Sequence, residues 1–189
     1  MPITAIDPKT ALVVIDMQRG IMGLETAHPS KDVLARVVEL VNAFRKHNLP
    51  VVLVNVAFSS DRADALNPRA EVSFNRPLPP DFSVLVDELK ADPERDIFIT
   101  KKQWGAFYGT GLDMQLRRRG VTGIVLCGIA TSIGVESTAR SAYEHGYNQT
   151  FASDAMTDMV QEAHDNSLTR IFPRMGEIGT TSEILSKLA

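Results

Sequence analysis

Three residues that could take part in chemistry lie beyond separate apolar segments of the chain. Asp16 follows "ALVVI", Lys101 follows "DIFIT", and Gly134 lies shortly after "GIVLCGI". Ligands of parallel sheets bind beyond the carboxyl ends of the strands, so a carboxylate, an ammonium group and a helix amino terminus could converge there. Each residue could also be present for a structural reason alone. Asp16 could cap a turn, Lys101 could be exposed to solvent, and Gly134 could be needed only so that helix and strand pack closely.

The apolar segments have the length and composition of strands. They are rich in β-branched residues and largely continuous, which is typical of strands buried on both faces. Stretches of helical period separate most of them, so the sequence predicts an α/β fold with a parallel sheet covered by helices on both faces. The predicted strands occupy residues 11–16, 51–58, 96–100, 123–129, 148–153 and 176–178.

Capping signals place the helix ends. Ser30 is placed to cap a first helix, and Thr110 with Asp113 approximates a capping box for a second, which ends at Gly120. A third helix follows "CGIATS" and closes at Gly146. We see no linker or repeat, and we therefore expect one domain over residues 1–189.

Bulk composition excludes several classes of function. The net charge of −3 gives no reason to expect a nucleic-acid partner. The chain has no apolar run near the roughly 20 residues that span a bilayer, and its amino terminus lacks the plan of a signal peptide. The single cysteine excludes an internal disulfide and a cysteine-rich metal site. We expect a cytoplasmic protein without a membrane partner.

Four segments in register carry a family resemblance: "ALVVIDMQRG", "KKQWGAFYGTGLDMQLRRRGV", "IVLCGIATSIGVESTARSAYEHGY" and "ASDAM". The chain resembles the isochorismatase-like hydrolases, and within them the YecD-like branch, from about residue 10 to near its end. The resemblance implies a three-layer, Rossmann-like α/β sandwich with a six-stranded parallel sheet. It also implies a homo-oligomer, a dimer or a tetramer.

The resemblance assigns a catalytic set to this chain. The family's Asp matches Asp16, its Lys matches Lys101, and its nucleophilic Cys matches Gly134. A cis peptide would lie between Ile129 and Ala130, at the substrate site. Glycine keeps the N–H groups of the helix amino terminus but has no atom that could form an acyl-enzyme.

Isochorismatases of this family also have glycine at the cysteine position and cleave a vinyl ether. By resemblance, protonated Asp16 would donate a proton to the enol-ether carbon, and water would capture the resulting cation. Lys101 would hold a substrate carboxylate or stabilise developing charge. Burial of Asp16 must raise its pKa against the effect of the lysine for this acid to work.

Other residues refine the predicted pocket. Trp104 and Phe107 could line it for a planar or apolar substrate, or could simply pack the loop. Ala130 stands where isochorismatases have Tyr, which removes a hydrogen-bond donor and an aromatic wall and argues against isochorismate itself as the substrate. His164 is interpreted as a helix packing or capping residue. The metal-binding Asp-x-His motif of nicotinamidases is not found between residues 51 and 80, and we expect neither a metal nor another cofactor.

Three functions compete. The leading one is a metal-free hydrolase of a small, carboxylated metabolite that uses Asp16, Lys101 and water. The second is a catalytically silent protein that binds a metabolite or supports assembly. The third is a thiol amidase that uses Cys127, although a thiol in a buried strand behaves as a small apolar residue. The irregular segment Asn67–Phe82 is predicted to be a lid over the pocket or a subunit contact.

Overall fold

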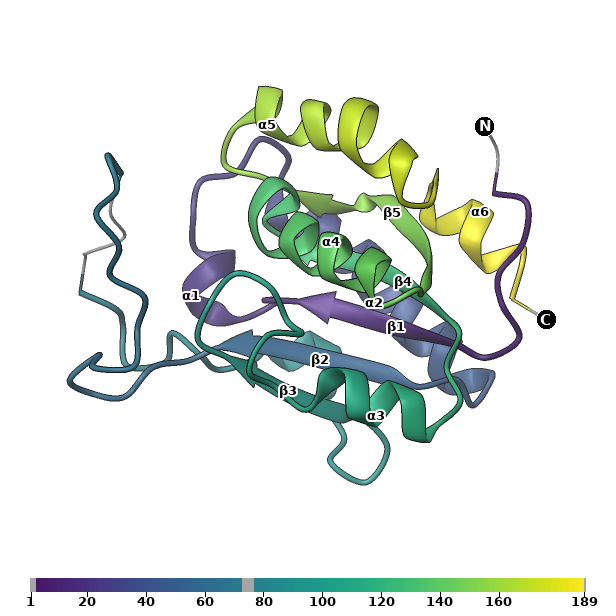
Figure 1. Cartoon of the computed structure of the whole chain (residues 1–189), viewed down its shortest axis with the longest axis horizontal. Coiled ribbons are helices and arrows are strands. Elements are labelled where there is room, and N and C mark those ends of the chain that lie inside the picture. Colours follow the sequence, from purple (N-terminus) through teal and green to yellow (C-terminus); the bar gives the residue numbers. More distant parts are fainter. Residues whose placement is uncertain (1–2, 73–76, 189) are drawn as a thin grey trace.

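A six-stranded, wholly parallel sheet forms the centre of the molecule, as the computed structural model in Figure 1 shows. The structure describes residues 3–72 and 77–188. The central strand β1 is buried at every position, as its continuous apolar sequence predicts. The strands are β1 Thr10–Ile15, β2 Val51–Val56, β3 Ile97–Lys101, β4 Gly123–Ile129, β5 Asn148–Thr157 and β6 Glu177–Gly179.

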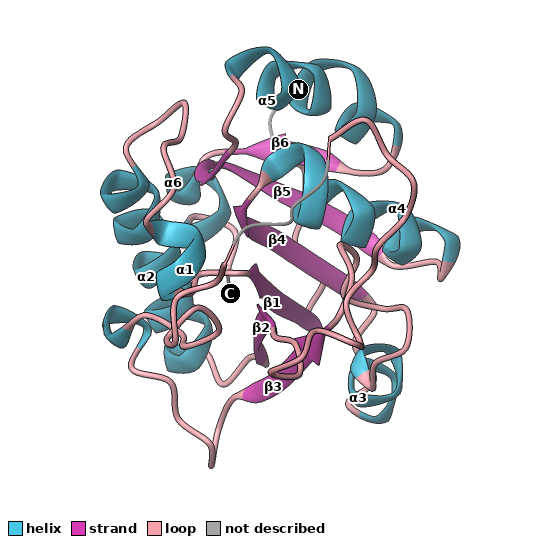
Figure 2. Ribbon diagram, turned by 90° about the vertical axis from the view of Figure 1, so that its left-hand side faces the viewer, coloured by secondary structure: helices cyan, strands magenta, loops and turns pink. Residues whose placement is uncertain are grey.

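Helices cover both faces of the sheet (Figure 2). Helices α1, α2 and α6 pack against one face, and α3, α4 and residues 167–175 pack against the other. Two separate apolar cores result, and the predicted three-layer α/β sandwich is confirmed. The helices are α1 Arg19–Met22, α2 Ser30–Lys46, α3 Leu112–Arg118, α4 Glu136–Glu144, α5 Gln161–Asn166 and α6 Thr181–Leu185.

Short helical turns complete the chain. The two π-helical turns are η2 (Thr131–Val135) and η3 (Ser167–Ile171), and the two 3-10 turns are η1 (Asp87–Leu89) and η4 (Phe172–Arg174). Turn η2 runs directly into α4, so β4 is connected to its helix through a widened first turn.

The strand order is β3-β2-β1-β4-β5-β6. Strands β2 and β3 therefore lie on one side of β1, whereas β4, β5 and β6 lie on its other side. The connections that leave β1 and β4 pass to opposite faces, and in open α/β sheets ligands bind beyond the carboxyl ends of two such neighbouring strands. Asp16 follows β1, and η2 follows β4, so both predicted site segments lie at this point of reversal.

Several predicted boundaries are wrong in detail. Ser30 is the first residue of α2 rather than its cap; Pro29 precedes the helix, and no side chain caps it. The capping box of Thr110 and Asp113 does not form, since α3 starts at Leu112 and the Asp113 carboxylate accepts from Arg117 and Tyr147 instead. One partner of Asp113 lies a turn along the same helix and the other lies 34 residues away, and both take the carboxylate away from the cap.

Strand β5 continues well beyond the predicted end at residue 153, after a register shift against β4. Among residues 3–72 and 77–188, no helix combines the length and the apolar character needed to cross a membrane.

Candidate active site

Asp16 occupies a strained position at the end of β1. Its backbone N–H still donates to the carbonyl oxygen of Val54 in β2, at 3.0 Å, but its φ angle is 51°. This left-handed conformation is uncommon for residues other than glycine and is usually kept where the surroundings require it. The Asp16 side chain is turned into the protein, and the residue is only 6% exposed.

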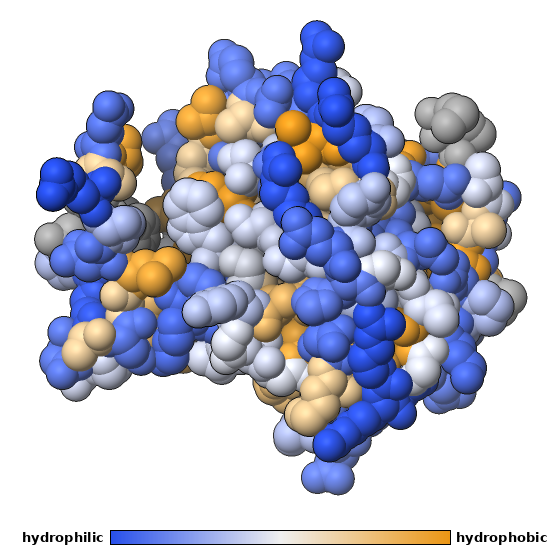
Figure 3. Space-filling view, in the orientation of Figure 1, coloured by the Kyte–Doolittle hydropathy of each residue, from blue (hydrophilic) through white to orange (hydrophobic). Residues whose placement is uncertain are grey.

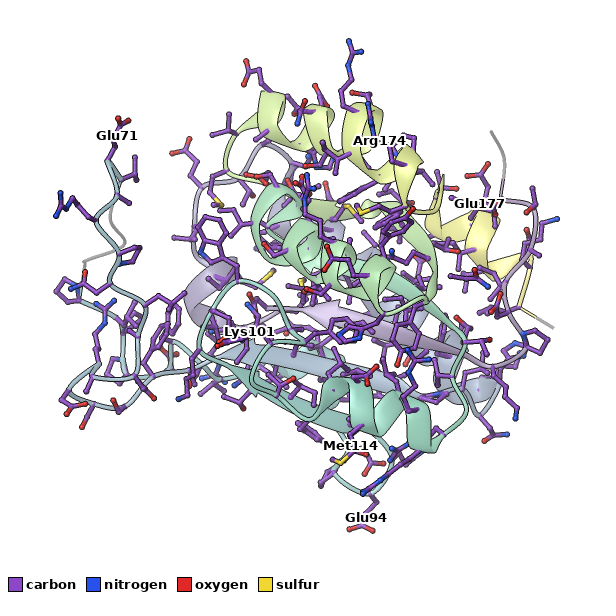
Figure 4. The ribbon with its side chains drawn as sticks, in the orientation of Figure 1. Glu71, Glu94, Lys101, Met114, Arg174 and Glu177 are labelled. Carbon is purple, nitrogen blue, oxygen red and sulfur yellow. The ribbon has the colours of Figure 1, made fainter. Side chains whose placement is uncertain are left out.

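Lys101 pairs with Asp16 across the end of β2. Alternation along β3 places Ile97, Ile99 and Lys101 on the buried side, and Lys101 is 2% exposed. The Lys101 Nζ donates to Asp16 Oδ2 at 2.7 Å and to the carbonyl oxygen of Gln103 at 3.2 Å. Figure 4 shows Lys101 at the end of the sheet toward which the arrows of β1 and β2 point.

The second oxygen of Asp16 is unsatisfied. Within the described part of the chain, Asp16 Oδ1 is buried and has no hydrogen-bond partner. Burial raises the pKa of Asp16 to about 6, although the charge and the hydrogen bond of Lys101 act in the opposite direction. Near neutral pH this carboxyl group can therefore carry a proton, and Oδ1 is the oxygen left free to donate it.

Gly134 packs closely beside this pair and leaves little room for a side chain. A Cβ atom built on Gly134 would lie 2.9 Å from Ile15 Cγ2, 3.4 Å from Asp16 Oδ2 and 3.6 Å from the carbonyl oxygen of Trp104. Any side chain here would have to displace Ile15 slightly and would occupy the volume beside the carboxyl group. Asp16, Lys101 and Gly134 thus meet at one point, as the sequence predicts.

Comparison with known proteins identifies the family of this chain. The family model described as "Isochorismatase domain" matches residues 10–183. The chain belongs to the isochorismatase family. It is 48% identical over 183 residues to the isochorismatase family protein YwoC of Bacillus subtilis, covering 95% of this chain and 94% of that protein. It is 46% identical over 181 residues to YecD of Escherichia coli O157:H7, covering 95% and 96%.

A solved structure and a more distant relative extend the comparison. An isochorismatase family protein from Burkholderia thailandensis superposes with a TM-score of 0.94 at 46% identity, covering 98% of each chain. The ureidoacrylate amidohydrolase RutB of Methylobacterium radiotolerans is 31% identical over 193 residues, covering 88% of this chain and 72% of that protein. The resemblance to the YecD-like branch is confirmed, and the chain belongs to a family of hydrolases.

The turn after β4 lies beside Asp16. The peptide bond between Ile129 and Ala130 is cis. The Ala130 carbonyl oxygen accepts from the backbone N–H groups of Ile133 and Val135, which fixes η2. The Ile129 and Ala130 side chains both lie in the apolar core, so any contact they make with a substrate has to come from their main chain.

The two aromatic candidates have different surroundings. Trp104 is 62% exposed, and its main chain lies beside Gly134. Phe107 is buried, and its ring packs against His145 and Tyr147, beyond the far end of α4. Trp104 is thus placed to border the site, whereas the position of Phe107 favours the packing alternative.

Cys127 is poorly placed to replace the missing nucleophile. Its side chain is fully buried in the core on the α2 face, with its Sγ 3.9 Å from the Val13 carbonyl oxygen. Burial raises the pKa of the Cys127 thiol, which disfavours the reactive thiolate. This geometry argues against the thiol-amidase alternative.

The structure adds supporting residues to which the sequence analysis gave no role in the site. The Asp158 carboxylate accepts from the Ser132 backbone N–H at 2.7 Å, and buried His164 is 2.8 Å from the Thr131 hydroxyl. The Thr138 hydroxyl bonds to the Gly134 carbonyl oxygen. Only for Thr138 did a local signal exist, because a residue four positions along a helix lies over the preceding turn. Among residues 3–72 and 77–188, no group of three side chains of metal-binding type comes together.

We predict that Cys127 of the native protein does not react with iodoacetamide on the time scale on which a free thiol is consumed. Burial removes both access and thiolate character. Mass spectrometry of the intact chain after timed labelling measures this, and the same protein in urea, which should be labelled once, is the control. Rapid labelling of the native chain together with loss of hydrolysis would restore the thiol-amidase alternative.

Proposed function

We propose that this isochorismatase-family protein is a cytoplasmic, metal-free hydrolase of a small, carboxylated metabolite. In this proposal Asp16 is the general acid, Lys101 is its electrostatic partner, and water is the nucleophile. The observation that carries the proposal is that the two oxygens of the Asp16 carboxyl group differ in their hydrogen bonding. Oδ2 accepts a hydrogen bond from Lys101, while buried Oδ1 has no partner within the described chain.

Vinyl-ether hydrolysis fits these groups. The electron pair of the C=C bond takes the proton from Asp16 Oδ1, which leaves a carboxylate on the protein and an oxocarbenium ion on the substrate. Water adds to the cationic carbon and loses a proton, and the hemiketal then collapses to a ketone and an alcohol. Lys101 stabilises the charge that develops on Asp16 as the proton leaves.

Gly134 suits this route better than an amidase route. Glycine has no atom that could act as a nucleophile, and the vinyl-ether route needs none from the protein. If this chain were an amidohydrolase like its relative RutB, it would need a nucleophile other than Gly134. Cys127 is poorly placed to supply one, because it lies in the core. A silent binding protein would also keep the pocket, but it would have no need for a carboxyl group with a raised pKa and an unpaired oxygen.

One test of this proposal is Asp16→Asn, which keeps the shape of the side chain but removes the acid. With isochorismate as the probe, pyruvate release should fall by about a hundredfold or more, the usual contribution of a general acid. In the unmutated protein kcat/KM should be constant below pH 6 and should fall as the pH rises through about 6, because only protonated Asp16 is active.

A coupled assay for pyruvate measures both effects, with Asp165→Asn, on the exposed side of α5, as the control that keeps full activity. Equal rates for Asp16→Asn and the unmutated chain, at matched melting temperatures, would exclude Asp16 as the acid.

Another test is Lys101→Met, which removes the charge but keeps the length of the side chain. Because Lys101 lowers the pKa of Asp16, its loss should move the midpoint of the pH profile of kcat/KM above about 6. The value of kcat should fall by about a hundredfold, as when a preorganised stabilising group is removed. The pH profile of pyruvate release checks this, and an unshifted midpoint would show that Lys101 does not act on Asp16.

We also propose that the chain forms a homo-oligomer through the arm, here defined as residues 58–72. Part of the predicted segment Asn67–Phe82, residues 73–76, lies outside the described residues. The base of the arm is held by Asp64, whose carboxylate pairs with Lys102 at 2.7 Å. Farther out, Leu66 and Val72 are 68% and 89% exposed. The upper end of the arm stands apart from the body in Figure 3.

Burial of these two apolar side chains against a second copy would remove them from water. Light scattering during gel filtration should therefore give a mass above the 20.7 kDa of one chain for the unmutated protein and a lower mass for Leu66→Asp with Val72→Asp. Glu94→Lys is the control, since Figure 4 shows Glu94 well away from Glu71 of the arm. An unchanged mass in the double variant would exclude the arm as the contact.

A further inference from the structure

Thr138 links the turn that carries Gly134 to the loop that follows Lys101. Its hydroxyl donates to the Gly134 carbonyl oxygen at 2.7 Å and accepts from the Ala106 backbone N–H at 3.1 Å. Thr138 and Ala106 are both 0% exposed. One buried hydroxyl therefore satisfies two polar groups that belong to different segments of the site.

A threonine that donates to the carbonyl oxygen four residues earlier is common in helices and has no function by itself. Ser141 of the same helix shows that ordinary case, because its hydroxyl donates to the Ser137 carbonyl oxygen at 3.2 Å. Thr138 differs from Ser141 because its oxygen also accepts a hydrogen bond from the neighbouring loop. This second bond makes Thr138 a bridge.

The loop on the other side of the bridge carries two groups of the site. Lys101 donates to the Gln103 carbonyl oxygen, and the Trp104 carbonyl oxygen lies 3.6 Å from the Cβ position of Gly134. The Gln103 side chain donates to the carbonyl oxygens of Gly105 and Tyr108, so hydrogen bonds within the loop tie its main chain together. The distance between this loop and η2 therefore sets how closely the Trp104 main chain approaches Gly134.

We propose that Thr138 is a positioning residue for the hydrolysis proposed above: it fixes the loop of Lys101 and Trp104 against the turn of Gly134. Its effect on the rate rests on that proposed function, whereas its effect on the loop does not. Thr138 itself touches no reacting atom. A displacement of about 1 Å between groups that hold a substrate can cost about a hundredfold in rate.

The test uses Thr138→Val, which keeps the shape of the side chain but can neither donate nor accept. We expect kcat for pyruvate release to fall by about tenfold or more, and Thr138→Ser, which keeps the hydroxyl, to restore most of it. Ser141→Ala, which removes only the ordinary helix bond, should retain full activity. Unchanged kcat in Thr138→Val, or no recovery in Thr138→Ser, would overturn the proposal.

Two measurements report on the bridge without activity. In Thr138→Val the Ala106 amide should lose its protection from hydrogen exchange, followed by NMR. Trp104, the only tryptophan of the chain, should gain a fast component in time-resolved fluorescence anisotropy. Retained protection and an unchanged anisotropy decay would reject the bridge. If the unmutated chain does not hydrolyse isochorismate, only the proposed function fails. The exchange and anisotropy measurements still show whether Thr138 holds the loop against the turn of Gly134.

Discussion

The buried contact between Asp16 and Lys101 is the interaction on which the rest of the site depends. Removing two charged groups from water is unfavourable, and their short hydrogen bond offsets only part of that cost. The remaining imbalance appears at Asp16, where burial prevails over the lysine and leaves a carboxyl group that titrates near neutral pH. A fold that retains such a pair, with one carboxyl oxygen unpaired among the described residues, keeps a proton available at a defined point.

The parallel sheet explains how residues from three segments reach this point. Strands β1 and β4 are neighbours although much of the chain separates them, and the topology reverses between them. The end of β2 lies between β1 and β3, and the long side chain of Lys101 extends across it to Asp16. The carboxyl ends of all these strands share one edge, so short loops suffice to gather the site there.

By resemblance, Gly134 stands where the family has its nucleophilic Cys, and the turn that carries it is well supported by hydrogen bonds. The turn around Gly134 is held from three sides, by Asp158 through Ser132, by His164 through Thr131, and by Thr138 directly. They hold the turn in place beside Asp16, as the proposed route requires, since in that route the acid is Asp16 and not a side chain of the turn.

The sequence by itself determined the α/β class, the continuous strands and the placement of Asp16, Lys101 and Gly134 near strand ends. These features follow from local composition and from the common edge of parallel strands, which a pattern reveals. Only the tertiary structure decided which Asp16 oxygen pairs with Lys101, that Phe107 belongs to the core, and that the Thr138 hydroxyl bridges two segments. Burial and hydrogen-bond partners depend on contacts between residues distant in the chain, and spacing along a sequence does not contain them.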